Sequence, residues 1–277
     1  MYNLNKVHPL QIDDLVRVGK NADGGYILSN QQIEKTEILL SFGIYNEWSF
    51  EQDFYKKKNE KLTIYAFDYS ATPLKLVYRA LKHLDAFVRY CVTGRISLST
   101  SSLKRTICCL QASMSLKRFF RKDKNRFFIP KFLGPADDNL FCSISSIFDK
   151  LLNGDVKNLS VFIKMDIEKW EYCTLPQFVP FFNKINGLVV EFHNLDIAGK
   201  NFENIIDILS PYFDIAHVHA NNAGGLIYGT NLPMLLEVTF INKDLLISRD
   251  NSKQNYPIKD IDFPNIAGKP DIPLSFG

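Results

Sequence analysis

The sequence has no segment typical of membrane insertion or secretion. No apolar run approaches the ~18 residues that a bilayer-crossing helix needs. The N-terminal stretch MYNLNKVHPLQIDDL lacks the basic-then-apolar order of a secretion signal. Cysteine is scarce, with five residues and no C-x-x-C spacing, so neither a disulfide framework nor a zinc site is indicated. We therefore expect a cytoplasmic protein whose cysteines are small buried hydrophobes.

Acidic residues are nearly absent from one segment of an otherwise balanced chain. The 277 residues are 46% hydrophobic and 23% charged, with a net charge of +3, which is ordinary for one globular domain. Between 75 and 126, however, 13 Lys and Arg residues accompany only two acids, a local net charge of +11. We expect a single domain over 1–277 with a basic insert at 74–126, which is helical because LKLVYRALKHLDAFVRY has helical apolar spacing.

Short apolar runs separated by helical or loop stretches predict the strands of a mostly parallel α/β sheet. These runs are 37–43, 62–68, 127–133, 161–166 and 188–193. Ser49 and Gln52 fit a capping box that opens a helix. Thr72 and Pro73 supply an N-cap and a first-turn proline for another helix. A third helix is expected at 201–211, where the apolar spacing is helical.

The two ends of the chain depart from this alternation. The runs 214–220 and 235–242 have no helix between them, which predicts an antiparallel pair. RVGKNADGGYIL, within an N-terminal extension at 1–36, resembles a hairpin because Asp-Gly-Gly can adopt positive φ at the turn. The proline-rich tail from Tyr256 is expected to wrap the domain without regular structure. Together the elements predict a doubly wound sheet with a binding crevice at the carboxyl ends of its strands.

The turn after the first strand lacks the glycines of a dinucleotide-binding motif. G-x-G-x-x-G lets backbone approach a pyrophosphate, whereas SFGIYNEWSFEQ offers only Gly43 and adds Glu47. This disfavours an NAD-dependent oxidoreductase and favours a ligand with a positive or neutral group at that position. Asp68 closes the second strand, where an acid typically accepts hydrogen bonds from ribose hydroxyls. An Asp after a strand is equally common as a turn or cap residue.

Two carboxylates end the apolar strand VFIKM. Asp166 and Glu168 lie two residues apart, so they can share one face and project toward the same crevice. Such a pair is costly unless a positive or hydroxylated group meets it.

Several motifs in order carry a family resemblance. SFGIYNEWSFE, YAFD, FIKMDIEKWEYCTL, VVEFHN and HVHANNAGG, with RVGKNADGGYIL and DFPN, resemble the FkbM-like methyltransferases, which use S-adenosylmethionine. The resemblance spans most of the chain outside the basic insert. It implies a Rossmann-like class I methyltransferase sheet with an antiparallel C-terminal strand, and S-adenosylmethionine as the cofactor.

The resemblance also implies which residues meet the cofactor. Gly43 and its loop would lie against the methionine part, Asp68 would hold the ribose, and Asp166 with Glu168 would lie near the methyl group and the acceptor. The full set of expected cofactor-binding residues is Gly43, Asn46, Glu47, Ser49, Phe50, Asp68, Tyr69, Asp166, Ile167 and Glu168. Where the family usually has Glu-Gly after the Asp, this chain has Glu168 and Lys169.

His193 is the preferred catalytic base for a hydroxyl acceptor. Glu191 precedes it by one pleat and could orient its imidazole, and Asp166 is the alternative base. The alternative is that His193 has only a structural role and forms a hydrogen bond with a backbone carbonyl at the strand end.

Further along the chain, His217, His219 and Asn221 alternate onto one face of a strand and could nominally join His193 in a metal site. Because the clustered Asp and Asn ligands of a hard divalent cation are lacking, we expect no metal. We expect acceptor binding instead, by His217, His219, Asn221 and Asn222.

The basic insert allows several interpretations. The preferred one is a lid that binds a phosphorylated acceptor such as a nucleotide-activated sugar. A peripheral membrane contact is the next. A nucleic-acid surface is disfavoured because no RNA- or DNA-binding motif accompanies it, and a solvated helical insert needs no partner at all.

The function expected is O-methylation of a hydroxyl on a sugar, a nucleotide-activated sugar or a surface-polysaccharide precursor. The alternatives are a different small phosphorylated acceptor, or a non-catalytic module that binds a nucleoside or glycan. The oligomeric state does not follow from the sequence.

Overall fold

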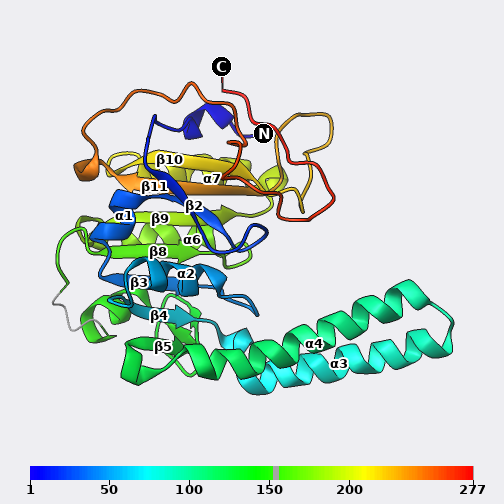
Figure 1. The fold of residues 1–277 in the computed structure, drawn as a ribbon. Helices are drawn as coiled ribbons and strands as arrows, with labels where there is room; N and C mark the ends of the chain where they lie inside the picture. The colour runs from blue at the N-terminus through cyan, green and yellow to red at the C-terminus, as the bar shows by residue number, and fades with distance from the viewer. Residues whose placement is uncertain (152–155, 277) are drawn as a thin grey trace.

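The computed structural model describes residues 1–151 and 156–276, so 152–155 and 277 of the expected domain lie outside it (Figure 1). Within these residues the main sheet is seven-stranded, in the order β10-β11-β9-β8-β3-β4-β5. Its strands are β3 (Ile38–Phe42), β4 (Thr63–Phe67), β5 (Arg126–Ile129), β8 (Val161–Met165), β9 (Ile185–Phe192), β10 (Phe213–Ala220) and β11 (Leu236–Asn242).

The strand order confirms the predicted fold class. From the central β3 the chain runs outward through β4 and β5, then returns to β8 on the other side of β3 and continues to β9. These five strands pair in parallel, whereas β11 is antiparallel to both of its neighbours, β9 and β10. This is the Rossmann-like methyltransferase sheet, and its topological switch point lies between β3 and β8.

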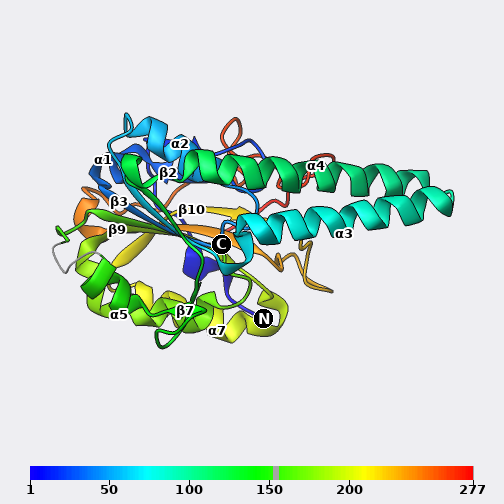
Figure 2. The ribbon, with the colours of Figure 1, turned by 90° about the horizontal axis from the view of Figure 1, so that it is seen from below.

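Two hydrophobic layers sandwich the sheet because neighbouring residues of each buried strand face opposite sides. Leu40, on β3, packs into the larger layer with η5 (Leu175–Lys184) and α7 (Leu195–Leu209). Leu39 packs into the other, with α2 (Ser49–Lys57) and the β1–β2 hairpin. Figure 2 shows α7 below the sheet and α1 and α2 above it.

The remaining elements lie outside the main sheet, and all but α3 and α4 are short. The hairpin strands are β1 (Leu15–Val18) and β2 (Tyr26–Ser29), and a parallel two-stranded sheet consists of β6 (Phe132–Leu133) and β7 (Phe141–Cys142). The other α-helices are α1 (Asn30–Lys35), α3 (Pro73–Val92), α4 (Ile96–Phe119), α5 (Ile144–Ser146) and α6 (Glu171–Thr174). The short turns of helix are η1 (Leu4–Val7), η2 (Tyr69–Ala71), η3 (Lys122–Lys124), η4 (Ile147–Leu151) and η6 (Lys243–Leu245).

The basic insert folds as the helical hairpin α3–α4, which extends outward from the sheet (Figures 1 and 2). Thr72 caps α3 and Pro73 occupies its first turn, as predicted. Small polar side chains of α4 bond to the backbone of α3 where the two helices pack. Ser113 Oγ donates to the Pro73 carbonyl oxygen over 3.2 Å, and Thr106 Oγ donates to the Ala80 carbonyl oxygen over 3.5 Å. No helix in the described part of the chain has the length and apolar content to cross a bilayer.

Two local predictions were wrong in detail. Ser49 does not cap α2, because Trp48 holds the N-cap position without a side-chain bond; a capping box instead joins Ser29 and Gln32 at α1. The run 127–133 is not one strand. It leaves the main sheet after Ile129, and the next residue, Pro130, has no N–H to continue a ladder.

The other end predictions hold, with shifted boundaries. The expected helix at 201–211 begins earlier, as α7, and β10 and β11 form the predicted antiparallel pair. The N-terminal hairpin is present, and the tail from Tyr256 has no helix or strand among its described residues. The expectation of buried cysteines was wrong for four of the five: Cys91, Cys108 and Cys173 are exposed, and Cys142 is only partly buried.

Candidate functional site

A cavity of about 480 Å³ opens at the carboxyl ends of β3, β4 and β8, at the switch point of the sheet. The loops that follow these three strands supply most of its wall, and the β1–β2 turn and the β6–β7 segment close its sides. Its lining residues are Asp23, Gly24, Phe42, Gly43, Ile44, Tyr45, Asn46, Glu47, Phe50, Glu51, Phe67, Asp68, Ser70, Phe132, Leu133, Phe141, Lys164, Asp166, Ile167, Glu168 and Trp170.

Gly43 allows the loops after β3 and β8 to touch. Its φ is +76°, and a Cβ at this position would lie 1.6 Å from the Asp166 carbonyl oxygen. Any larger residue would therefore push the two loops apart. The Lys164 ammonium donates to the Gly43 carbonyl oxygen over 2.5 Å, which fixes the same contact from the β8 side.

Asp68 ties the loop after β4 to the loop after β3. Its Oδ2 accepts the amides of Ile44 (3.2 Å) and Tyr45 (2.7 Å), and its Oδ1 accepts the amide of Ser70 (2.6 Å). A carboxylate offers about four acceptor positions, so one is left for a ligand hydroxyl. Asp68 is thus both a turn residue, through its bonds to backbone amides, and an acid that lines the cavity, as the two interpretations of the sequence predicted.

The cavity lining is acidic. Six carboxylic acids and one lysine line it. Burial tends to raise the pKa of Glu47, but the hydrogen bond and charge of Lys20 outweigh it and lower the pKa. Burial raises the pKa of Asp166, with Lys164 and His193 opposing. Burial likewise raises the pKa of Glu51, whose carboxylate accepts the Ser41 hydroxyl. A lining of this kind attracts cations and repels phosphates.

Most of the cofactor-binding residues expected from the sequence line this cavity. Eight of the ten do so, and Ser49 and Tyr69 do not. The Ser49 amide donates to Glu47 over 2.8 Å. The Tyr69 ring lies beneath the Lys75 ammonium, 2.9 Å from the ring centroid, at the base of α3.

Several lining residues were missed by the sequence analysis. Phe132 and Phe141 form an apolar wall with ring centroids 6.1 Å apart. Phe132 was missed because 127–133 was predicted to be one strand, and no prediction covered Phe141. Lys164 was also missed, although a lysine one pleat before Asp166 in an apolar strand was a usable signal.

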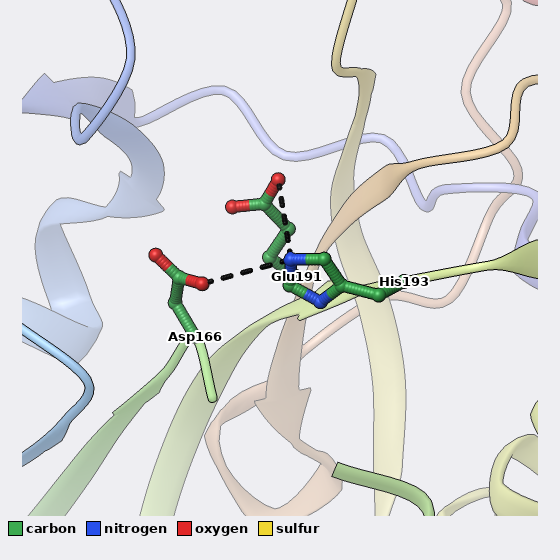
Figure 3. A group of neighbouring side chains, drawn as sticks. All are labelled: Asp166, Glu191 and His193. Carbon is green, nitrogen blue, oxygen red and sulfur yellow. Dashed lines mark ion pairs between the residues drawn. The ribbon is translucent and has the colours of Figure 1, made fainter. Parts of the chain in front are cut away.

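Beside the cavity, Asp166, Glu191 and His193 converge from the ends of β8 and β9 (Figure 3). His193 Nε2 lies 3.8 Å from Asp166 Oδ1, 3.8 Å from Glu168 Oε2 and 4.0 Å from Glu191 Oε1. Asp166 belongs both to this group and to the cavity wall, whereas Glu191 and His193 are buried and do not line the cavity.

Glu171, not Glu191, orients the imidazole of His193. Its Oε1 lies 3.0 Å from His193 Nδ1 and also accepts the His193 amide over 2.8 Å. Glu171 is fully buried, and the sequence analysis missed it. Burial alone would lower the pKa of His193, but the hydrogen bond and charge of Glu171 dominate, with help from Asp166 and Glu168, and raise it.

Glu191 has a different partner from the one expected. Its Oε1 accepts Asn221 Nδ2 over 2.7 Å. Burial, reinforced by the charges of Asp166 and Glu237, raises the pKa of Glu191 well above its usual value. Glu237 lies directly across from it on β11.

The other predicted acceptor-binding residues hold the C-terminal tail. His217 Nε2 lies 3.1 Å from Asp262, and His219 lies between Glu237 (3.2 Å) and Asp271 (3.0 Å). Asn222 bonds to backbone of the tail at Ile266. The structure does not bring His217, His219 or Asn222 to the cavity, nor does it join His217 or His219 to His193. The sequence could not show this, because their partners lie some 40–50 residues away.

The comparisons with known proteins add little to this geometry. No family model matches the chain, and no curated protein matches it. A solved structure of the Methanococcus jannaschii fibrillarin pre-rRNA processing protein is 10% identical; the alignment covers 87% of this chain and 76% of that one, with a TM-score of 0.36. Two structures of the rRNA methyltransferase aviRa from Streptomyces viridochromogenes are 9% identical, with TM-scores of 0.32 and 0.30. They cover 76% of this chain and 77% and 78% of their own. At these scores the fold assignment rests on strand order alone.

Proposed function

We propose that this chain is an S-adenosylmethionine-dependent methyltransferase. The observation that carries the proposal is an acidic cavity at the switch point of a methyltransferase-type sheet, lined by six carboxylic acids and one lysine. Such a lining suits a sulfonium cation and opposes the phosphates of a dinucleotide. When bound, the cofactor supplies a methyl group on a positively charged sulfur.

The residues present fit the parts of that cofactor. The aromatic wall of Phe132 and Phe141 offers an apolar surface for adenine beside Asp68, whose remaining acceptor position suits a ribose hydroxyl. Glu168 and Asp166 lie at the β8 end, where the positive charge would be stabilised. The cavity volume of about 480 Å³ falls within the range of about 300–1,000 Å³ for small-molecule sites.

The acceptor in this proposal is a hydroxyl group. Removal of its proton needs a base near the cavity. His193 Nε2 faces Asp166 and Glu168 while Glu171 holds the other ring nitrogen, so the lone pair on Nε2 can take a proton. Asp166 is the alternative base, and it is the member of the group that lines the cavity.

The acceptor class rests on the resemblance to FkbM-like methyltransferases, which points to a sugar, a nucleotide-activated sugar or a polysaccharide precursor. The basic insert does not strengthen this, because none of its residues lines the cavity in the described part of the chain. A phosphorylated acceptor therefore has no support from a lid. We retain the sugar hydroxyl as the proposed target.

The binding test compares a cationic ligand with a neutral one. S-adenosylmethionine carries a sulfonium and S-adenosylhomocysteine a neutral sulfur, and both are titrated calorimetrically into the purified chain. We expect micromolar binding of both. Glu168→Lys, at a side chain that is 82% exposed, should weaken the sulfonium ligand about tenfold more than the neutral one.

The matched control is Glu34→Lys, which makes the same charge change at an exposed residue that does not line the cavity. It should leave both affinities unchanged. Equal losses for the two ligands in Glu168→Lys, or no binding of either to the unaltered chain, would contradict the proposal.

Transfer is tested by mass spectrometry on a panel of nucleotide sugars and cell-surface glycan precursors incubated with the chain and the cofactor. The proposal expects the mass of one CH₂ to be added to at least one hydroxylated acceptor. Cofactor binding without transfer to any member of the panel would favour the alternative, a non-catalytic binding module.

A further inference from the structure

Asp166, Glu191 and His193 bring three metal-ligand atoms together. The three atoms all lie within 4.8 Å of one another, and Figure 3 shows the side chains pointing to a common centre. The distances from His193 Nε2 to the two carboxylates, 3.8 and 4.0 Å, are too long for hydrogen bonds. They match the separation of about 3–4 Å between ligands that each lie about 2.1 Å from one cation.

The state of His193 is an independent indication of a ligand. Its side chain is 9% exposed, and Nε2 has no hydrogen-bond partner among the residues that the structure describes, whereas Nδ1 is bonded to Glu171. Nε2 faces the carboxylate oxygens of Asp166, Glu168 and Glu191 at 3.8–4.0 Å. A group of this kind favours positive charge between the ring and the carboxylates, and a bound cation would supply it.

Neighbouring residues hold the ligands in place. Glu171 fixes the imidazole through Nδ1, and Asn221 donates to the Glu191 carboxylate over 2.7 Å. Carboxylates and amides commonly orient the ligands of metal sites in this way. Such support is absent from a merely acidic surface patch.

We infer that Asp166, Glu191 and His193 bind one divalent first-row transition cation such as Mn²⁺ or Zn²⁺. An imidazole ligand argues against Ca²⁺ and Mg²⁺, which prefer oxygen alone. Three protein ligands leave coordination positions open, and Asp166 reaches the cavity wall, so these positions face the acceptor.

The role of the cation rests on the proposed function. It would bind the acceptor hydroxyl oxygen and lower the pKa of that hydroxyl. The O–H bond then breaks with its proton passing to water, while the oxygen keeps the electron pair and remains on the cation. With the cation bound, His193 and Asp166 are its ligands, and the lowered pKa of the hydroxyl takes the place of the general base that the metal-free site would use.

The test measures metal binding without cofactor or acceptor. The full-length chain is freed of metal with a chelator and titrated with Mn²⁺, and free Mn²⁺ is followed by electron paramagnetic resonance. We expect one Mn²⁺ per chain with micromolar affinity, and pulsed spectra with nitrogen coupling from one imidazole. His193→Gln and Glu191→Gln should each weaken binding at least tenfold.

His83→Gln, on the α3–α4 hairpin, is the matched control and should leave binding unchanged. Circular dichroism establishes whether each variant is folded. If a variant does not fold, the nitrogen coupling in the unaltered chain still shows whether an imidazole binds the Mn²⁺. Absence of that coupling, or millimolar binding, overturns the site. Because no cofactor is present, this result is independent of the methyltransferase test.

A separate observation concerns the α3–α4 hairpin, whose outer surface carries apolar stripes. On each helix, large apolar side chains recur every three, four or seven residues while remaining exposed. On α3 they are Leu74, Val77, Leu81, Leu84, Val88 and Val92, and on α4 they are Ile96, Leu103, Ile107, Leu110 and Met114. Exposed stripes of this kind mark an interaction surface.

The charge of the hairpin favours one kind of partner. Over 73–119 the chain has nine Lys and Arg residues and one acid, Asp85, a net charge of +8. A second copy of the hairpin would bring the same charge and be repelled. Apolar side chains beside cations instead match the acyl chains and headgroups of an anionic lipid surface.

We further propose that the hairpin docks the protein on anionic membranes. The full chain is sedimented with vesicles of phosphatidylcholine alone or mixed with phosphatidylserine. Binding should be at least tenfold stronger to the anionic vesicles and should fall with added salt. Leu81→Ser with Val88→Ser should abolish it.

The matched control is Tyr228→Ser with Ile247→Ser, two fully exposed apolar residues outside the hairpin, at 102% and 104% relative exposure. It should bind vesicles as the unaltered chain does. Equal binding to both vesicle types overturns the proposal. So does a dimer in analytical ultracentrifugation that the Leu81 and Val88 changes dissociate.

Discussion

At the residue scale, the site depends on backbone positions that the sequence marks unequally. Gly43 is marked, since only glycine fits against the Asp166 carbonyl at its φ of +76°. Lys169, in the loop after β8, also adopts a positive φ, of +84°, although it is not a glycine. This loop therefore takes a left-handed path without the residue that would adopt it at least cost.

Lys169→Gly should stabilise the protein. A left-handed backbone costs a non-glycine residue about 1–2 kcal/mol, and glycine loses about 0.5–1 kcal/mol through unfolded-chain entropy. The expected net gain is about 0.5–1 kcal/mol in the free energy of unfolding, measured by urea denaturation. Lys169→Ala keeps the strain and should change stability by less than about 0.5 kcal/mol. Equal effects of the two changes would show that the backbone is not strained there.

At the element scale, strand ends were predictable and their partners were not. Alternation within VFIKM correctly placed Asp166 at the end of a buried strand that meets the crevice. Glu171 lies five residues further on, in α6, and nothing local indicated that it would bond to His193. The hairpin α3–α4 was predicted as helical, but its direction away from the cavity depends on how its base packs. There Arg79 lies over the Tyr45 ring, 4.1 Å from its centroid, and donates to the Ser70 carbonyl.

At the scale of the whole molecule, the C-terminal tail closes the fold by ion pairs with β10. His219 lies between Glu237 and Asp271, and His217 is paired with Asp262. Burial alone would lower the pKa of His219, but the hydrogen bonds of Asp271 and Glu237, together with the charges of Glu237 and Asp262, raise it from 6.5 to about 10. The tail is thus held by a histidine that is charged in the folded state.

This charge predicts how stability depends on pH. Because the folded pKa of His219 exceeds the unfolded value of 6.5, its contribution is complete below about pH 6.5 and is lost as pH rises through about 10. The free energy of unfolding should fall by up to about 1.4 kcal/mol per pH unit between those limits. His219→Gln should flatten this slope, measured by urea denaturation from pH 6 to 10. Asp271→Asn should flatten it in part, and parallel slopes for all three proteins would contradict the assignment.

The sequence by itself determined the class of fold and the edge of the sheet where the site lies. Apolar periodicity and turn residues are local, so the strands that lead to Gly43, Asp68 and Asp166 followed from short stretches of chain. Only the tertiary structure decided which polar groups meet. Glu171 reaches His193 across 22 residues, Asn221 reaches Glu191 across 30, and His219 reaches Asp271 across 52. Such pairings arise from the packing of distant elements, and neither composition nor periodicity specifies them.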